Sequence, residues 1–382
     1  MKTMLRWTSA LWMLSVSTMA SAGSLPTGFT VGYNEAWIEN NYANWLASDP
    51  LFGEPSAFNN GSLVSPMFLG MEAGNTKIVR IWLFPALQGI CVNTSVPGTC
   101  PGATQGLTSE FVGNLKALFI LAQANNLKLY ITALNANDAN GATPSNCHPT
   151  QSWCPTEYTY YQNLFSNSGG ATTAYENNVL APILNLMSQY QDVIYGFDLI
   201  NEIEAAINAG FFSSWTGARA WIQNMTKYVN TQASWLPVTS TAGWGYAVQE
   251  VTLGLFSGLG LNFYDVHIYL DSGKYSGQTA LCSKTKSDKL QIVLGEYGQK
   301  STTVSDTIQN TATTNFLNGA KSSCFSSALA WKYETLGSIP PYLSYLYITS
   351  SGALSTACTS TQMVPGPACP RPAYFTIKDF DP

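Results

Sequence analysis

Residues 193–202 read VIYGFDLINE, an apolar run that ends in an amide and a carboxylate, Asn201 and Glu202. Residues 291–298, QIVLGEYG, repeat this arrangement, with Glu296 near the end. Short runs that are rich in β-branched and aromatic side chains are typical of β-strands. We therefore predict that each stretch is a strand that carries a polar residue at its carboxyl end.

Further runs of this kind alternate with amphipathic helical stretches along the chain. The predicted strands are 29–33, 78–84, 127–134, 193–200, 236–240, 261–269, 290–294 and 328–331, and the clearest helices are 109–125, 172–190, 212–231 and 305–320. Alternating strands and helices indicate an α/β fold of parallel units, and eight units predict a closed (β/α)8 barrel, the TIM barrel. An open doubly wound sheet is the alternative, although its G-x-G-x-x-G turn and a Walker loop are absent.

The chain length fits one barrel with insertions, since 382 residues exceed the roughly 250 of a minimal one. No linker divides the sequence, so we predict a single catalytic barrel over residues 23–350. Residues 351–382 are rich in Ser, Thr and Pro. They are expected to form a disulfide-tied tail, or a finishing hairpin, that packs on the barrel.

Residues 1–22 have the features of a secretory signal peptide. Lys2 and Arg6 precede a short apolar stretch, and residues 20–22 match an A-x-A cleavage pattern. The apolar stretch is shorter than the ~20 residues that cross a bilayer, and no later stretch qualifies. We therefore expect a secreted protein that begins at Gly23 and has no membrane partner.

All eight cysteines follow this segment, and most lie close to another in sequence. Proximity gives the pairs Cys91–Cys100, Cys147–Cys154, Cys358–Cys369 and, by remainder, Cys282–Cys324. In an oxidising compartment we expect structural disulfides. A zinc site is the alternative, but no C-x-x-C is present and only His148 and His267 would add imidazole ligands.

Composition excludes several classes of protein. Charged residues are 10% of the chain and apolar residues 46%, which excludes a disordered chain. The 17 basic residues are outnumbered by 22 acidic ones and form no run, so we expect no nucleic-acid partner. Aromatic residues are 13%, which fits sugar binding as well as it fits a large aromatic core.

Glu202 and Glu296 end apolar strands on the side of the barrel where barrel enzymes build their active sites. A carboxylate at such a place is costly unless it is functional or paired. A salt bridge or a helix cap is the structural alternative for each. Because their strands are three apart in a closed barrel, the two carboxylates can face each other across its mouth. Glycoside hydrolysis requires such a pair.

Two other predicted strands carry compatible residues. Arg80 lies in the apolar run IVRIWLF and needs a carboxylate partner. Glu296 is one candidate, and a structural Asp is the alternative. Asp265, His267 and Tyr269 alternate along one side of the sixth predicted strand. A lone core histidine is usually structural, but the position of His267 beside a strand end favours a functional role.

Together these motifs resemble the clan A glycoside hydrolases, and most closely family five, with its cellulases and β-mannanases. The resemblance covers about residues 28–335. It rests on I-N-E at 200–202, H-I-Y at 267–269, G-E-Y-G at 295–298, Arg80 and Trp331.

That resemblance implies a role for each motif residue. Glu202 would be the general acid/base and Glu296 the nucleophile. The residues implied on the substrate side are Asn201 at the sugar 2-hydroxyl, Arg80 and Tyr269 beside the nucleophile, His267 along the site and Trp331 under a sugar ring.

The third predicted strand departs from the cellulase pattern. Many family cellulases carry a His at its end, whereas residues 131–141 read ITALNANDANG. This Asn-rich stretch is similar to the mannanase branch, and the Asn135 amide is a candidate for the axial 2-hydroxyl of mannose. Glu204 is the main rival of Glu202, but we expect it to lie out in the loop.

Aromatic residues near several strand ends predict an open cleft in which successive sugar rings stack. They are Trp37, Trp82, Trp153, Trp244, Tyr246 and Trp331. Among them Trp244 and Trp331 are the predicted substrate-binding residues.

We therefore expect a secreted O-glycosyl hydrolase that cuts β-1,4-linked polysaccharide internally and with retention, mannan ahead of glucan. Arg80 would keep Glu296 ionised, and the charge of Glu296 would raise the pKa of Glu202. Their carboxyl groups would lie about 5–5.5 Å apart. No metal or organic cofactor is expected, and the chain is expected to be a monomer.

Three alternatives stay open at this point. An exo-acting β-glycosidase would cleave short oligosaccharides instead of polymers. A non-catalytic carbohydrate-binding barrel would share the aromatic residues but would not need the opposed glutamates. A serine hydrolase would need a G-x-S-x-G elbow, which is absent.

Overall fold

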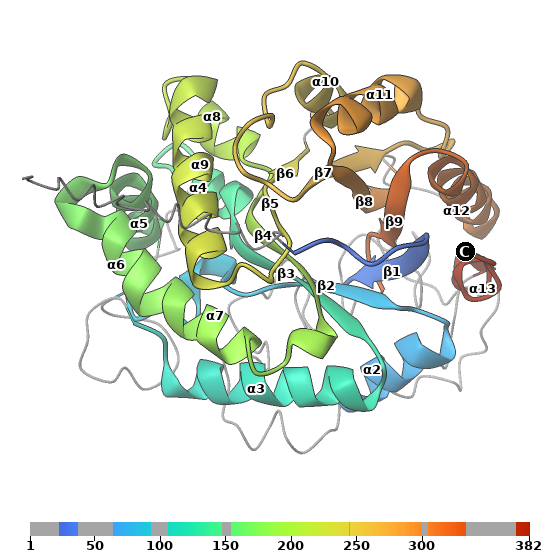
Figure 1. Cartoon of the computed structure of the whole chain (residues 1–382), viewed down its shortest axis with the longest axis horizontal. Coiled ribbons are helices and arrows are strands. Elements are labelled where there is room, and N and C mark those ends of the chain that lie inside the picture. Colours follow the sequence, from blue (N-terminus) through green and yellow to red (C-terminus); the bar gives the residue numbers. More distant parts are fainter. Residues whose placement is uncertain are drawn as a thin grey trace, which may run out of the picture.

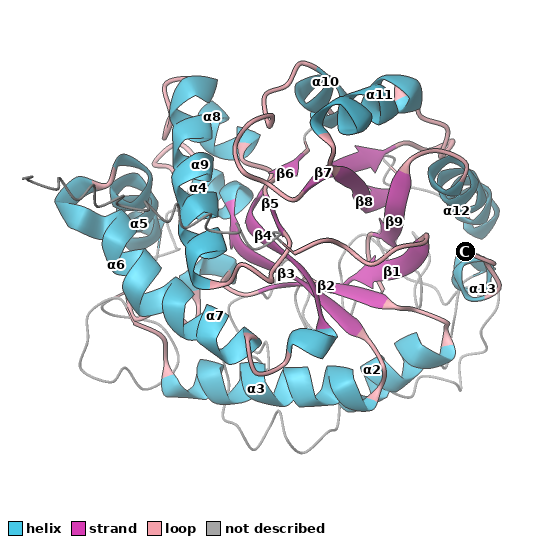
Figure 2. Ribbon diagram, in the orientation of Figure 1, coloured by secondary structure: helices cyan, strands magenta, loops and turns pink. Residues whose placement is uncertain are grey.

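The computed structural model describes residues 23–36, 64–92, 106–146, 154–243, 245–299, 305–333 and 372–382. Strands form a ring at its centre, and helices surround the ring (Figure 1, Figure 2). The strands are β1 Thr30–Asn34, β2 Ile78–Trp82, β3 Lys128–Asn135, β4 Ile194–Asn201, β5 Val238–Thr239, β6 Thr241–Ala242, β7 Phe263–Tyr269, β8 Gln291–Gly298 and β9 Phe325–Ala330.

All strand pairs are parallel, in the order β5-β4-β3-β2-β1-β9-β8-β7-β6. The predicted strand 236–240 contains the short strand β5, and a second short strand, β6, follows it after Ser240. Val238 of β5 lies opposite Phe197 of β4, and Thr241 of β6 lies opposite Asp265 of β7. The two pieces therefore bridge the ends of the sheet, which confirms the (β/α)8 barrel over the open sheet.

The helices lie on the outside of the strand ring. They are α2 Val64–Ala73, α3 Ser109–Ala124, α4 Ala136–Gly141, α5 Cys154–Ser166, α6 Ala171–Tyr175, α7 Ala181–Met187, α8 Glu204–Asn208, α9 Trp215–Gln232, α10 Ala247–Thr252, α11 Gln278–Asp288, α12 Asp306–Lys321 and α13 Pro372–Lys378.

Helix boundaries follow local capping chemistry. The Thr108 hydroxyl accepts a hydrogen bond from the Phe111 amide, which confirms the cap expected for the helix at 109–125. Ser214 caps α9 in the same way, so this helix begins three residues later than predicted. The predicted helix 172–190 is built from α6 and α7 joined by a π-helical turn, Glu176–Leu180.

Alternation along β2 divides the core into two layers. Val79 and Ile81 belong to the large apolar cluster between strands and helices. Ile78 belongs to a smaller cluster with Tyr130, Phe263 and other residues, which fills the inside of the barrel. Because side chains alternate along a strand, Arg80 points into the barrel, two positions beyond Ile78. The barrel interior is therefore apolar at one end and polar towards the carboxyl ends of the strands.

One predicted disulfide lies within the described residues. Cys282 of α11 is bonded to Cys324, which precedes β9, and their Cα atoms lie 5.5 Å apart. Cys91 is also disulfide-bonded. The predicted pairs Cys91–Cys100, Cys147–Cys154 and Cys358–Cys369 each include a cysteine outside the described residues or one whose side chain is not described.

Most of the predicted tail, residues 351–382, lies outside the described residues, as does the predicted signal peptide. Residues 372–378 form helix α13 instead of a hairpin strand, and Tyr374 donates a hydrogen bond to the Gly70 carbonyl of α2. Figure 1 shows α13 beside α12. No helix among the described segments is long and apolar enough to span a bilayer.

Candidate active site

The polar residues of the site gather at the carboxyl ends of the strands. Glu202 directly follows β4, and Glu296 lies near the end of β8. Both Arg80 of β2 and His267 of β7 are buried. The structure therefore brings together the motif residues that are far apart in sequence.

A bulge at Gly295 directs Glu296 into the barrel. Leu294 lies opposite Val266 and Glu296 lies opposite His267, so Gly295 is left without a partner across the pair. A Cβ atom on Gly295 would lie 2.1 Å from the Asp265 carboxylate, so only glycine fits there. The extra residue reverses the alternation and places Glu296 on the inner face. The strand β8 continues through the bulge to Gly298.

Arg80 holds four groups of the site in fixed positions. Nη1 donates to Glu296 Oε1 at 2.5 Å and to Asn34 Oδ1 at 3.1 Å. Nη2 donates to Asp198 Oδ2 at 3.0 Å and to Asn201 Oδ1 at 2.9 Å. Burial lowers the pKa of Arg80, but the charges of Glu296 and Asp198 outweigh it and raise that pKa, so the guanidinium stays charged.

Asp198 is a site residue that the sequence analysis missed, and Asn34 of β1 is a further residue held by Arg80. Asp198 also accepts hydrogen bonds from the hydroxyls of Thr132 and Thr241. The Asn34 amide donates to the Gly295 carbonyl at 2.8 Å, which supports the bulge. The signal for Asp198 was present, because it is a lone charge inside the run VIYGFDLINE.

Glu296 is bound on both oxygens. Oε1 accepts from Arg80, and Oε2 accepts from the Tyr269 hydroxyl at 2.6 Å. Nδ1 of His267 lies 3.3 Å from Oε2. Burial raises the pKa of Glu296, and the charges of His267 and Arg80 offset this only in part.

Glu202 is held from three sides. Its Oε1 lies 2.9 Å from Nδ1 of His267, and its Oε2 accepts from the Asn137 amide at 2.8 Å. Its backbone φ is +50°, an uncommon value for a residue other than glycine. The side chain lies on Gly243, where an added Cβ would be 2.2 Å from Glu202 Oε1.

The pKa shifts differ from the sequence expectation. Burial raises the pKa of Glu202, but the hydrogen bonds from His267 and Asn137 outweigh it, and the net pKa is lowered. The sequence analysis expected it to be raised by Glu296. The difference arises because His267 lies between the carboxylates: burial lowers its pKa, while Glu296 and Glu202 raise it more. The two carboxylates therefore favour the protonated form of the imidazole.

The two carboxylates lie close together. A carboxylate oxygen of Glu202, a ring nitrogen of His267 and a carboxylate oxygen of Glu296 lie within 4.8 Å of one another. An oxygen of Glu202 is therefore at most 4.8 Å from an oxygen of Glu296, which favours the expected short separation of about 5–5.5 Å between the carboxyl groups. The same three atoms have the types that bind a transition metal. Arg80, Tyr269 and Asn137 already donate hydrogen bonds to these carboxylates. This favours a hydrogen-bonded cluster over a metal centre.

Asn201 and Asn135 form a hydrogen-bonded chain beside Glu202. Asn201 donates to Asn135 Oδ1 at 3.0 Å, and Asn135 donates to Asp138 Oδ1 at 2.7 Å. The Ala86 amide donates to the other oxygen of Asp138. Asn135 therefore contacts Asn201, whereas Asn137, two residues further along the chain, donates a hydrogen bond to Glu202.

Trp331 lies next to Trp82 at the mouth of the barrel. Their ring centroids are 5.6 Å apart, and Tyr269 packs against the same cluster. Each indole is 6% exposed, so the described residues leave only an edge of each open. Tyr246, in contrast, is 60% exposed. The predicted substrate-binding Trp244 lies outside the described residues, as do Trp37 and Trp153.

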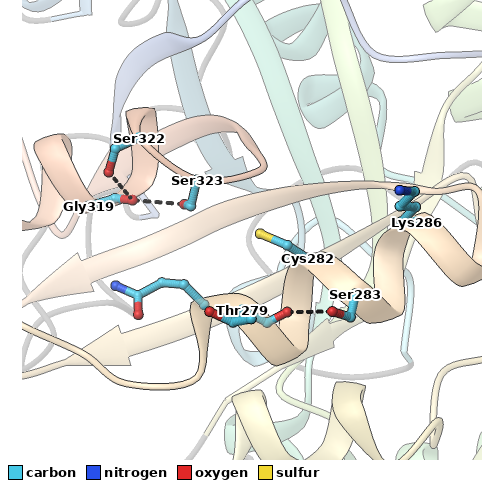
Figure 3. Close-up of a pocket in the computed structure, with 8 residues that line it drawn as sticks. Thr279, Cys282, Ser283, Lys286, Gly319, Ser322 and Ser323 are labelled. Carbon is cyan, nitrogen blue, oxygen red and sulfur yellow. Dashed lines mark hydrogen bonds between the residues drawn. The ribbon is translucent and has the colours of Figure 1, made fainter.

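A surface pocket of about 480 Å³ lies elsewhere, between α11 and α12 (Figure 3). It is lined by Gln278, Thr279, Cys282, Ser283, Lys286, Gly319, Ser322 and Ser323. Its hydroxyls donate to helix carbonyls, as from Ser283 to Thr279 and from Ser323 to Gly319. The lining holds no carboxylate and no aromatic ring, so it has none of the chemistry of the barrel mouth.

Comparison with known proteins places the fold. No protein-family model matches the chain. The curated mannan endo-1,4-beta-mannosidase of Cryptopygus antarcticus is 21% identical over 356 residues, which cover 81% of this chain and 84% of that protein.

Solved structures share the barrel. The β-mannanase of the blue mussel Mytilus edulis is 18% identical with a TM-score of 0.55, covering 82% of this chain and 92% of the mussel chain. An endoglucanase of Pseudomonas stutzeri is 14% identical with a TM-score of 0.52, covering 83% and 88%. The chain thus has the fold of these glycoside hydrolases, in agreement with the resemblance that its motifs indicated.

Proposed function

We propose that this chain is a secreted β-glycoside hydrolase that cuts β-1,4-mannan internally by double displacement with retention. The observation that carries the proposal is the arrangement of Glu202 and Glu296. One carboxylate is fixed by Arg80 and Tyr269, and the other, within 4.8 Å, is bonded to His267 and Asn137.

The first step requires one proton and one nucleophile. Glu296 attacks the anomeric carbon while the glycosidic C–O bond breaks, and the leaving oxygen takes a proton from Glu202. That proton is available from His267, because Nδ1 lies 2.9 Å from Glu202 Oε1. Proton transfer along this hydrogen bond leaves the imidazole neutral and keeps the charge of the cluster unchanged.

The second step reverses these roles. Glu202, now ionised, removes a proton from water, and the resulting hydroxide attacks the anomeric carbon from the leaving-group side. The bond to Glu296 breaks and its carboxylate is released. Arg80 and Tyr269 stabilise that carboxylate through the contacts seen in the free site. The proton that Glu202 takes from water returns to His267 along the same hydrogen bond, which restores the starting state of the site.

Mannan is proposed as the substrate on two grounds. The curated protein similar in sequence is a mannan endo-1,4-beta-mannosidase. The Asn-rich stretch also supplies the Asn137 amide, which donates to Glu202, and Asn135, which accepts a hydrogen bond from Asn201. Glucan is the second candidate, since an endoglucanase shares the fold.

Release of reducing ends from mannan, carboxymethyl cellulose, mixed-linkage glucan and xylan tests this proposal. Glu296→Ala, prepared in parallel, is the control for contaminating activity. We expect mannan to be cut fastest and its viscosity to fall early, because internal cuts shorten chains before many ends form. Faster cleavage of glucans than of mannan would reject mannan as the substrate. Release of reducing ends without an early fall in viscosity would reject endo action, and no cleavage of any polysaccharide would favour a binding protein.

A further inference from the structure

Glu204 was the rival for the acid/base role, and the structure gives it a different environment. It is 4% exposed at the start of α8 and accepts a hydrogen bond from the Gly243 amide at 3.0 Å. Its side chain is also hydrogen-bonded to that of Glu250 on α10. Glu204 therefore does not point into the barrel mouth with Glu202 but is buried beside it.

The Glu204 and Glu250 carboxyl groups form a buried pair without a cation. Glu250 is 8% exposed, and no Lys, Arg or His forms an ion pair with either group among the described residues. Oε2 of each glutamate is buried without another hydrogen-bond partner. Two carboxylates at hydrogen-bond distance in such a place cannot both be ionised, so the pair retains one proton.

Gly243 connects this pair to the catalytic centre. Its amide is bound by Glu204, and its Cα lies directly under the Glu202 side chain, where a Cβ would fall 2.4 Å from the Glu202 carboxyl carbon. Whatever fixes Gly243 therefore fixes the position of Glu202. The pair also joins α8 to α10. Because α8 follows β4 and α10 follows β6, the pair links the carboxyl ends of these two strands beside Glu202.

We propose that Glu204 and Glu250 share one proton and that this pair positions the acid/base Glu202 through Gly243. The inference rests on the proposed function, since it assumes that Glu202 donates the proton to the leaving group. Glu204 and Glu250 are positioning residues, because Gly243 and Glu202 stand between them and the substrate.

The surroundings of the pair make its proton sensitive to pH. Burial raises the pKa of Glu204, its bond to Glu250 raises it further, and the charge of Glu202 raises the pKa of both. On the neighbouring elements, Asp138 of α4 is bound by Asn135 and Ala86.

Three further charged groups on neighbouring elements have partners of their own. Lys284 and Asp288 of α11 form their own ion pair, and His267 of β7 is bonded to Glu202. As pH rises, the pair loses its proton, two buried charges repel, and the support of Glu202 is weakened.

The test compares two substrates that differ in their need for an acid. Mannopentaose has a sugar leaving group that needs a proton. The dinitrophenolate group of 2,4-dinitrophenyl β-mannobioside, in contrast, leaves without protonation. Glu250→Ala is expected to lower kcat on mannopentaose about tenfold more than kcat on the dinitrophenyl substrate. This difference is smaller than the roughly 100-fold or more that a general acid contributes, because the acid is displaced and not removed. Glu250→Gln keeps a hydrogen bond to Glu204 and is expected to restore the ratio, and Glu72→Gln, on the exposed face of α2, is the matched control.

The pH dependence gives a second readout that does not need the alanine variant to fold. In the natural protein the ratio of the two kcat values, mannopentaose over dinitrophenyl substrate, is expected to fall as pH rises. In Glu250→Gln the ratio is expected to fall only where the acid itself loses its proton, without the additional loss that the pair causes, because the amide has no proton to lose. Equal losses of Glu250→Ala on both substrates, or a ratio in Glu250→Gln that falls as in the natural protein, would overturn the inference.

Glu202→Ala, measured alongside, separates this inference from the proposed function. If Glu202→Ala itself loses activity equally on both substrates, Glu202 is not the acid and the proposed function fails. If only Glu202→Ala is selective, the acid assignment stands and the role of the pair is rejected.

Discussion

Nδ1 of His267 lies 2.9 Å from Glu202 Oε1 and thereby joins the proposed acid to the proposed nucleophile, whose Oε2 is 3.3 Å from the same atom. One imidazole thus neutralises part of the charge of two carboxylates. This contact explains why the pKa of Glu202 is lowered by its hydrogen bonds despite burial.

Replacing His267 tests this charge balance. Burial raises the pKa of Glu296, and the imidazolium lowers it in part. In His267→Gln the positive charge is gone, so the pKa of Glu296 rises and a higher pH is needed to ionise it. The acidic limb of the kcat/KM profile is therefore expected to move to higher pH. An unchanged limb, or one moved to lower pH, would contradict the described charge balance.

Removing Arg80 is expected to damage both stability and activity. Arg80→Met leaves Asp198 and Glu296 buried without their cation, at a cost of about 3–5 kcal/mol in the free energy of unfolding. Chemical denaturation measures this cost, and activity should be lost with it. Retention of the natural stability would show that the two carboxylates are not held as described.

Tyr269 and Asn137 support different glutamates, so their variants should differ. Tyr269→Phe removes a bond to Glu296 and is expected to slow poor and activated substrates alike. Asn137→Ala removes a bond to Glu202 and is expected to slow mainly substrates with poor leaving groups. Rates on mannopentaose and on the dinitrophenyl mannobioside measure both, and the opposite pattern would exchange the roles of the two glutamates.

The disulfide between Cys282 and Cys324 closes a loop with a sequence separation of 42 residues. Loop-closure entropy predicts that the double variant Cys282→Ala/Cys324→Ala loses up to about 4 kcal/mol of stability. Thermal unfolding measures this loss, and mass spectrometry of the unreduced protein should detect no free thiol. Several free cysteines, or bound zinc, would contradict the expectation of an oxidising compartment.

The barrel was predictable from the sequence because its strands are short apolar runs separated by helices of clear periodicity. The division of this region into β5 and β6 at Ser240 was not predictable. It depends on the pairing of β5 with β4 and of β6 with β7. The bulge within β8 was also not predictable, because the conformation at Gly295 depends on the Asp265 carboxylate of another strand.

The site was predictable where a polar residue interrupts or ends an apolar run, as at Arg80, Glu202 and Glu296. Asp198 carried the same signal and was overlooked. The contact of Asn137 with Glu202 comes from the turn after β3, whose path no local pattern specifies. The pKa directions required the position of His267 between the carboxylates, which is a property of three strands together.

Trapping the covalent intermediate tests the central claim most directly. A 2-deoxy-2-fluoro β-mannosyl substrate with a dinitrophenyl leaving group forms the glycosyl-enzyme but slows its hydrolysis. Peptide mass mapping should then find one fluorosugar bound to Glu296, and none in Glu296→Gln. A label on another residue, or full turnover without any label, would contradict the assignment of Glu296 as the nucleophile.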